Sequence, residues 1–335
     1  MANSMDTFFN YALQVGASDL ILAEGLVPTV RVAGLVRAIP DATKLEFGDL
    51  ESFLGPLDGE NGAFRGGPWA DVDWRVRYSR EAFGKMAILH PVGMDAPGFA
   101  SLAVPDSVMS LLGACSGIVL FAGPTSCGKT TTASAYVSEL CLQKKLRASF
   151  LDAIPEYKLQ TGQSLVKRNR AKVSLADEIA QNVRSGTDLF WLGDLAAESC
   201  VSMLKAAESG ALVVATVNAG SAKDVLTYLL AAETAENKKL AQTLLAANLK
   251  AIVTQRLILS TDGTALVPAW EVLYNDTNIA PLIHSGEYYK VPQAMRSAVS
   301  EGALPLDDSL LALVRENRIT KDVARLYAVD ESHFL

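Results

Sequence analysis

The chain has 335 residues, half of them hydrophobic and a fifth charged, and it carries a formal net charge of −7. This length is long for one hydrophobic core and suits two domains. The acidic balance argues against broad nucleic-acid binding, and no apolar run approaches the roughly 18 residues of a membrane-spanning helix. The first residues lack the basic and apolar regions of a signal peptide, so we expect a cytoplasmic protein that binds no nucleic acid.

The first hundred residues predict a small α+β domain. Apolar residues at helical spacing predict helices over 6–15 and 45–54. The predicted strands are 19–22, 27–32, 35–39, 74–78 and 85–89. Residues 91–105 contain three prolines and two glycines and are expected to form a linker. We therefore predict an N-terminal domain at residues 1–98 and a second domain at residues 99–335.

After this linker, predicted strands and helices alternate along the chain. The predicted strands are 117–122, 147–152, 188–193 and 211–217, and the predicted helices are 129–144, 174–185, 195–209, 222–232 and 237–248. A mixed strand region follows to about residue 273, and helices run from residue 307 to the end. This alternation is typical of an α/β fold in which helices cover both faces of a parallel sheet.

Residues 123–130 read Gly-Pro-Thr-Ser-Cys-Gly-Lys-Thr, a complete G-x-x-x-x-G-K-[ST] phosphate-binding loop between a predicted strand and a predicted helix. Its glycines let the backbone N–H groups turn toward the phosphates, Lys129 places a cation on the β and γ oxygens, and the Thr130 hydroxyl suits Mg²⁺. The predicted nucleotide-binding residues are Gly123, Pro124, Thr125, Ser126, Cys127, Gly128, Lys129, Thr130 and Thr131. Because Cys127 precedes a helix N-terminus, we expect its thiol pKa to be lowered. The alternative is a glycine turn beside an unrelated lysine.

Hydrolysis of a bound triphosphate needs acidic groups at the ends of neighbouring strands. Asp194 and Asp152 each end a predicted strand, and Glu156 follows shortly afterwards. We predict these three carboxylates as catalytic candidates, and we predict Asp194 with Thr130 as the Mg²⁺ site. The alternative for each aspartate is a helix N-cap, which is common where a strand leads into a helix.

Three arginines, Arg75, Arg77 and Arg80, lie on or just after the predicted strand at 74–78. Phosphoryl transfer is accelerated by a guanidinium that reaches the phosphates across an interface, so these are candidates for that role. The alternative is a row of charges on a solvated face.

The order of these segments resembles the PilT-like branch of the secretion ATPases, the hexameric motors that retract type IV pili. The similarity covers nearly the whole chain. The matching segments are Gly16–Leu22, Val30–Gly34, Gly117–Thr132, Ala206–Gly210, Ile252–Gln255 and Trp270–Val272.

This resemblance implies a PAS-like N-terminal domain and a RecA-like P-loop ATPase domain that ends in C-terminal helices. It also implies ATP and Mg²⁺ as cofactors and a ring with nucleotide held between subunits. The ring would be a homo-oligomer, with six subunits as the expected number, or a hetero-ring with a paralogous ATPase. The protein would lie in the cytoplasm, bound to the inner membrane through a pilus or secretion platform protein.

Several positions depart from the family pattern. Asp152-Ala153 replaces a Glu-Asp pair, and Asp194 replaces a glutamate. Val217-Asn218-Ala219 lacks the family's histidine, and His90 stands at an arginine position. Residues 278–285 lack the two arginines and the glutamate of a further family motif. The phosphate loop is therefore complete while the groups around it are altered.

These changes leave two functional hypotheses. A shift of about 1 Å, as from Glu to Asp, can lower a rate roughly 10²-fold, and loss of a positioned arginine can lower it roughly 10³-fold. Binding of ATP needs mainly the loop, Lys129 and Thr130. The first hypothesis is an ATP-hydrolysing motor subunit of a type IV pilus or related secretion machine. The second is a nucleotide-binding paralogue with little turnover that supports an active ring. A soluble metabolic P-loop kinase is disfavoured because no substrate-binding lid is evident.

Overall fold

The computed structural model describes residues 5–152, 155–168, 174–299 and 302–334. The chain divides into two compact units. The N-terminal unit comprises Met1–Asp95, Ile154–Lys158 and Thr264–Leu266, and the C-terminal unit comprises the rest. The domain boundary predicted at residue 98 stays a prediction. No helix in the described part of the chain has the length and apolar character needed to cross a bilayer.

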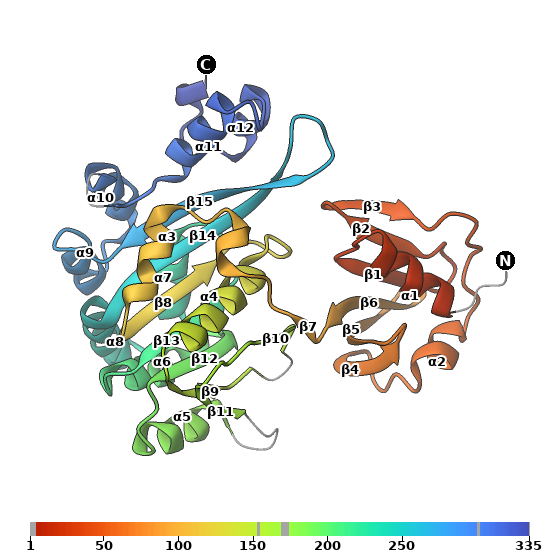
Figure 1. Cartoon of the computed structure of the whole chain (residues 1–335), viewed down its shortest axis with the longest axis horizontal. Coiled ribbons are helices and arrows are strands. Elements are labelled where there is room, and N and C mark those ends of the chain that lie inside the picture. Colours follow the sequence, from red (N-terminus) through yellow and green to blue (C-terminus); the bar gives the residue numbers. More distant parts are fainter. Residues whose placement is uncertain (1–4, 153–154, 169–173, 300–301, 335) are drawn as a thin grey trace. The chain divides into compact units, whose positions relative to one another are not determined.

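The N-terminal unit contains a six-stranded antiparallel sheet with the strand order β3-β2-β1-β6-β5-β4 (Figure 1). Its elements are α1 (Met5–Gln14), β1 (Asp19–Ala23), β2 (Thr29–Val32), β3 (Leu35–Ala38), α2 (Asp49–Leu54), β4 (Asn61–Trp69), β5 (Val72–Glu81) and β6 (Gly84–Val92). Phe9 of α1 stacks on Trp69 and packs against Trp74 beneath the sheet. This aromatic group, in which Phe9 and Trp74 are fully buried, fixes α1 on the sheet.

A short segment from later in the chain joins this unit. Strand β10 (Tyr157–Lys158) pairs in parallel with β7 (Met94–Asp95), and the Gly93 N–H donates to the Glu156 carbonyl. Residues 155–158 are therefore held to the N-terminal unit by backbone hydrogen bonds, although the chain on either side belongs to the C-terminal unit.

The C-terminal unit contains a seven-stranded sheet with the order β11-β9-β12-β13-β8-β14-β15. Its strands are β8 (Gly117–Ala122), β9 (Arg147–Phe150), β11 (Leu165–Arg168), β12 (Leu189–Asp194), β13 (Leu212–Val217), β14 (Leu249–Leu259) and β15 (Leu266–Tyr274). The strands from β11 to β14 are parallel to their neighbours. Strand β8, which is buried along its whole length, lies near the middle, between β13 and β14.

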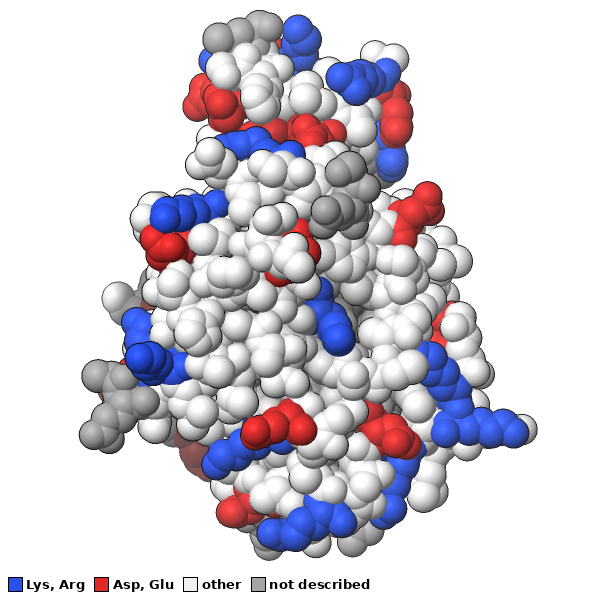
Figure 2. Space-filling model, turned by 90° about the vertical axis from the view of Figure 1, so that its left-hand side faces the viewer, with Lys and Arg blue, Asp and Glu red and all other residues white. Residues whose placement is uncertain are grey.

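Helices cover both faces of this sheet (Figure 1). The helices of this unit are α3 (Asp106–Ser110), α4 (Lys129–Gln143), α5 (Leu175–Arg184), α6 (Cys200–Glu208), α7 (Ala222–Ala231), α8 (Ala235–Asn248), α9 (Ile279–Ser285), α10 (Val291–Ser297), α11 (Leu306–Arg315) and α12 (Lys321–Tyr327). Ile118 and Leu120 of β8 pack into the core beneath α6 to α9, whereas Phe121 meets Tyr136 of α4 on the other face. On the surface that Figure 2 shows, lysines and arginines are interspersed with aspartates and glutamates.

The structure confirms the alternation of strands and helices that the sequence predicts for the C-terminal part. The predicted strand at 117–122 has the bounds of β8, and the predicted helix at 129–144 ends one residue beyond α4. Strands β4 and β11 were not predicted. The expected linker at 91–105 contains the end of β6, the short strand β7 and a 3₁₀ helix at Phe99–Leu102, since backbone pairing and the burial of Phe99 order it.

Glu271 of β15 fixes the start of α7. Its Oε1 accepts a hydrogen bond of 2.7 Å from the Ala222 N–H in the first turn of that helix, and only 6 % of the residue is exposed. Burial raises the pKa of Glu271 to about 7, although the Ala222 N–H and the charge of Arg256 act to lower it. The folded protein therefore takes up a proton at this carboxyl at a higher pH than the unfolded chain does.

We expect this carboxyl to make the stability pH-dependent. The protonated form is favoured on folding, so its stabilising contribution is complete below the unfolded pKa near 4.3 and is lost as the pH rises to about 7. Glu271→Gln keeps an oxygen for the Ala222 N–H without the charge. At pH 8 the free energy of unfolding of the variant should exceed that of the parent by about 1–3 kcal/mol, and at pH 5 the two should differ little. Urea unfolding at both pH values measures this, and an equal effect at both would contradict it.

Candidate active site

The phosphate-binding loop joins the carboxyl end of β8 to the amino end of α4, in the middle of the parallel sheet. Gly123 and Gly128 have φ angles of 152° and 84°, and Ser126 has a φ of 62°. Such positive values favour glycine, and they turn the backbone so that the loop curls over the helix N-terminus. An anion in the loop would face the unpaired N–H groups and the positive end of the dipole of α4, whose N-cap is Gly128.

The neighbouring strand β14 presses closely on this loop. A side chain at Gly123 would collide with the Cys127 sulfur and with the Gln255 carbonyl oxygen. A Cβ atom at Gly128 would lie 2.9 Å from the Gln255 Nε2 atom, which no real Cβ contact shows. Gly123 is therefore required by the close approach of the β14 backbone as well as by its own backbone angle, whereas Gly128 is required chiefly by its positive φ, since the end of the Gln255 side chain can shift.

The two residues expected to contact phosphate and metal have different surroundings. Lys129 is 8 % exposed, and its Nζ donates to the Pro124 carbonyl of the same loop at 3.4 Å. This bond holds the ammonium group over the loop. A bound phosphate would replace the Pro124 carbonyl, which is a weak acceptor at this distance. Thr130 is half-buried and makes no side-chain hydrogen bond to any residue in the described ranges. Its hydroxyl is therefore open to a ligand.

The expectation for Cys127 is wrong. Burial raises the pKa of its thiol above the ordinary value, and the Lys129 N–H and the nearby cations do not offset that effect. The side chain is 4 % exposed and points under the loop toward Gly123 instead of outward. Loss of hydration outweighs the field of the helix N-terminus, so the thiolate is disfavoured.

Gln255 is a site residue that motif analysis of the loop alone misses. Its Oε1 accepts a hydrogen bond of 2.7 Å from the Thr132 hydroxyl of α4, and both side chains are buried. Its amide nitrogen lies against Gly128, and its backbone carbonyl lies against Gly123. Gln255 thus contacts the loop at Gly123 and at Gly128, and it contacts α4 at Thr132. The only sequence signal was the resemblance of Ile252–Gln255 to the secretion ATPases.

Asp194 lies at the carboxyl end of β12, where Asp194 pairs with Thr216 of β13. Strand β13 separates β12 from β8, so Asp194 and the loop are two inter-strand spacings apart, roughly 10 Å in the plane of the sheet. The Asn218 Nδ2 group donates to both carboxylate oxygens, at 3.0 and 3.2 Å. The next helical turn has Ala196 as its N-cap, so the cap interpretation does not describe Asp194.

Asp152 follows β9 and lies beside Asp194 at the carboxyl edge of the sheet. A Cβ atom at Gly193, which has a φ of 66°, would lie 2.7 Å from the Asp152 carboxyl carbon. The Asp152 carboxylate therefore covers the backbone directly before Asp194. Two acidic groups and the amide of Asn218 meet at the carboxyl edge of the sheet that also carries the phosphate loop, the edge at which parallel sheets bind ligands.

Glu156 belongs to the N-terminal unit, where it pairs with one of the candidate arginines. Its Oε1 lies 2.5 Å from the Arg75 Nη2 atom, and its Oε2 lies 4.0 Å from His90 Nε2. The other ring nitrogen of His90 is 3.5 Å from Asp19. Burial acts to raise the pKa of Asp19, but hydrogen bonds from His90 and Ser18 hold it below its ordinary value. Arg75 and Glu156 thus neutralise each other within this unit.

The other two candidate arginines are exposed. Arg77 points away from the buried side chains of β5 and makes no ion pair with the described residues. Arg80 lies near the end of the strand, where its charge contributes to lowering the pKa of Glu51, after the larger effects of the hydrogen bond and the charge of Lys85. Arg77 and Arg80 are therefore the candidates that are left available to a ligand or another subunit, whereas Arg75 is occupied by Glu156.

Comparison with known proteins places the chain in a family. The family model described as "Type II/IV secretion system protein" matches residues 95–303, and the chain belongs to this family. The type IV pilus ATPase PilU of Pseudomonas aeruginosa is 25 % identical over 331 residues, with 94 % of this chain and 86 % of that protein covered. The type IV pilus retraction ATPase PilT of the same organism is 25 % identical over 329 residues, covering 94 % and 95 %.

Solved structures share the fold. The pilus retraction motor PilT with bound ADP superposes with a TM-score of 0.78 at 24 % identity, covering 98 % of both chains. The ATPase DotB of Legionella pneumophila superposes with a TM-score of 0.79 at 20 % identity, covering 96 % of this chain and 94 % of that one. The α/β fold predicted from the sequence is confirmed, and so is the resemblance to the PilT-like secretion ATPases.

We expect Gln255 to determine nucleotide affinity. Gln255→Ala leaves the buried Thr132 hydroxyl without its acceptor and removes the support of the loop, so the Kd for ATP should rise about 5- to 30-fold. Gln255→Glu retains an acceptor for Thr132 but places a carboxylate beside the phosphates, so its Kd should rise further and fall with added salt. Titration with a fluorescent ATP analogue measures both. A change below twofold in the alanine variant, with its thermal unfolding intact, would show that Gln255 does not support the loop.

Proposed function

We propose that this chain is an ATP-binding and ATP-hydrolysing motor subunit of a type IV pilus or related secretion machine. The observation that carries the proposal is the complete phosphate loop at the start of α4, on the same sheet edge as Asp194 and Asp152. The named relatives are pilus ATPases, and a PilT structure of the same fold holds ADP, which supports nucleotide binding at this loop.

The residues have distinct roles in this proposal. The loop N–H groups and Lys129 bind and orient the β and γ phosphates, and desolvation of Lys129 strengthens its attraction for them. Asp152 and Asp194 are the acceptors that orient an attacking water, with Gly193 leaving space for the Asp152 carboxylate. Arg77 and Arg80 are the exposed candidates to reach the phosphates of another subunit. Glu156, which pairs with Arg75, acts as a structural group and not as a base.

A magnesium ion fits the donor groups of this site. The Thr130 hydroxyl lacks a side-chain partner in the described ranges, and Asp194 presents an exposed carboxylate at the same sheet edge. Hydroxyl, carboxylate, water and phosphate oxygens are the ligands that Mg²⁺ prefers. When bound, the ion would neutralise charge on the phosphates.

We further propose that the chain works in a ring, expected to have six subunits, built of itself or of itself and a paralogous ATPase. Its partner would be an inner-membrane pilus or secretion platform protein, which would hold a cytoplasmic protein at the membrane. The names of the relatives support this assignment of machine.

One observation favours the second function, a nucleotide-binding paralogue with little turnover. Asp194 is both shorter than the glutamate of the family pattern and held by the Asn218 amide through both oxygens. An amide does not titrate, so it cannot exchange a proton with a water or phosphate. A carboxylate held in this way is restrained from moving toward the substrate.

Steady-state phosphate release and ATP titration on purified protein distinguish the two functions. Lys129→Ala should weaken ATP binding and lower turnover at least about 10²-fold, since it removes the cation on the phosphates. Asp194→Asn should lower turnover by a similar factor with ATP binding retained. Thr227→Ala, a substitution on the exposed side of α7, is a matched control that should change neither.

In the opposite outcome, the parent binds ATP, and loses that binding in Lys129→Ala, yet releases no phosphate above background. This result would exclude the motor function and support the paralogue. In that case Asn218→Ala, which frees the Asp194 carboxylate, or Asp194→Glu, which lengthens it, should raise the rate sharply from near zero. If neither the parent nor these variants bind ATP, both proposals fail.

A further inference from the structure

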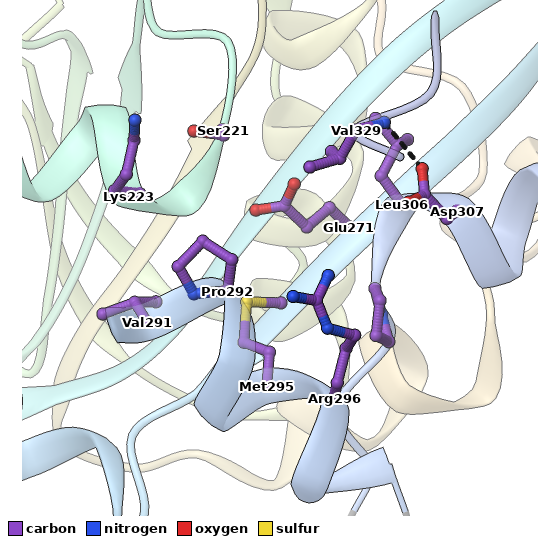
Figure 3. Close-up of a pocket in the computed structure, with 11 residues that line it drawn as sticks. Ser221, Lys223, Glu271, Val291, Pro292, Met295, Arg296, Leu306, Asp307 and Val329 are labelled. Atoms are coloured by element: carbon purple, nitrogen blue, oxygen red, sulfur yellow. Dashed lines mark hydrogen bonds between the residues drawn. The ribbon is translucent and has the colours of Figure 1, made fainter. Parts of the chain in front are cut away.

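A cavity of about 140 Å³ lies within the C-terminal unit, away from the phosphate loop (Figure 3). It is formed by the start of α7, the middle of β15, helix α10, the start of α11 and Val329 after α12. Its volume is below the roughly 300–1,000 Å³ of pockets that hold drug-sized ligands, so it suits a single side chain and not a nucleotide. Nothing in the proposed ATPase mechanism uses it.

The walls of this cavity are apolar and its base is acidic. Val291 and Met295 of α10 and Leu306 of α11 line it, and the Glu271 carboxylate points into it between them (Figure 3). Among described residues, Glu271 makes one hydrogen bond, through a single oxygen, to the Ala222 N–H. A carboxylate can accept about four hydrogen bonds, so most of the acceptor capacity of this largely buried residue is unused.

The second acidic group in the lining is already satisfied. Asp307 is 4 % exposed and accepts hydrogen bonds from the Val329 and Asp330 N–H groups at 2.8 and 3.0 Å, one of which is drawn in Figure 3. His333 lies 3.9 Å from it. Glu271 is therefore the acidic group of the lining that keeps an oxygen without a hydrogen bond from any described residue.

The charges that face Glu271 do not neutralise it. Arg256 of β14 donates to the Gly220 carbonyl at 3.0 Å, and Asp224 and Asp307 add negative charge from α7 and α11. Lys223 and Arg296 stand at the lining, and neither forms an ion pair with Glu271 within 4.0 Å. Burial raises the pKa of Glu271 and outweighs the opposing charge of Arg256. A further cation beside the carboxylate would offset the cost of burying it.

We propose that this cavity receives a basic side chain, a lysine or arginine, presented by a partner protein. The aliphatic stem of such a side chain would pack against Val291, Met295 and Leu306, and its charged end would hydrogen-bond to the free oxygen of Glu271. An apolar wall with one buried carboxylate matches both parts of a lysine or arginine side chain. A purely apolar side chain would leave Glu271 unpaired, and an acidic one would be repelled.

Arg296 provides a directional test of this proposal. It is an exposed side chain at the lining of the cavity, with its guanidinium turned toward Glu271 (Figure 3). A cation that enters the cavity is repelled by this guanidinium and competes with it for Glu271. Removing the charge of Arg296 should therefore strengthen binding, whereas removing the charge of Glu271 should weaken it.

The experiment uses the full chain with its methionine methyl groups labelled with ¹³C, because Met295 reports from inside the cavity. The Met295 signal, assigned with Met295→Leu, is followed by NMR during titration with n-butylammonium chloride, n-butanol and sodium butyrate. We expect a saturable shift with n-butylammonium and none with butyrate or butanol. The apparent affinity should fall roughly tenfold from pH 8 to pH 6, as the fraction of ionised Glu271 falls.

The variants and peptides complete the test. Glu271→Gln, which keeps an acceptor for the Ala222 N–H, should weaken binding at least about tenfold. Arg296→Gln should strengthen it about twofold or more. Leu306→Phe, which fills the cavity without altering its charges, should abolish the shift. The tripeptide Ac-Gly-Lys-Gly-NH₂ should reproduce the shift and Ac-Gly-Gln-Gly-NH₂ should not.

Three results would overturn the proposal. An equal response to butanol would show a merely apolar cavity, and unchanged binding in a folded Glu271→Gln variant would show that the carboxylate is not the recognised group. Entry of n-butylammonium but not of the lysine peptide would restrict the cavity to free small amines. All of these results are independent of ATP turnover, so the proposal stands or falls separately from the proposed function.

Discussion

The contact between β14 and the phosphate loop is the constraint on which the rest of the site depends. The loop leaves the end of β8 and curls back at once into α4, and Gln255 on the neighbouring strand fills the space beside it. That approach leaves no room for a side chain at Gly123, beside which the Cys127 sulfur is buried. The same packing desolvates Lys129, which increases the strength of its attraction for a phosphate. Affinity for nucleotide is therefore built into the packing of the sheet as well as into the motif.

The acidic groups on the same edge are positioned by a different set of contacts. Asp152 lies over Gly193, and the Asn218 amide donates hydrogen bonds to both carboxylate oxygens of Asp194. These contacts position both carboxylates in advance of substrate, and the two hydrogen bonds to Asp194 oppose its movement. Binding and hydrolysis are thus separable properties of this chain, since one depends on the loop and its support and the other on how far Asp194 can shift. The same reasoning applies to Arg75, which is neutralised by Glu156, while Arg77 stays free of ion pairs in the described ranges.

Much of the fold was predictable, for reasons that particular elements make plain. Strand β8 is buried on both sides and reads as an unbroken apolar run, and α4 follows a motif that ends in a helix start. Strand β11 was not predicted because its burial is slight and it is ordered by pairing with β9, which local sequence does not reveal. Cys127 was wrongly predicted for a similar reason. Its position at a helix start is a local feature, but its burial beneath the loop is created by β14, more than a hundred residues away.

The sequence by itself determined the presence of a phosphate loop, the alternating α/β pattern and the family, because each is written in local spacing and in the order of segments. It also determined which residue types were available for acid, base and metal chemistry. Only the tertiary structure decided which of these groups meet. It joined Glu156 to Arg75, joined Asp194 to Asn218, placed Gln255 behind the loop, and left Glu271 under-partnered in an apolar cavity. The physical reason is that burial and hydrogen-bond partners arise from residues far apart in the chain, and these set the charge state and the freedom of every group in the site.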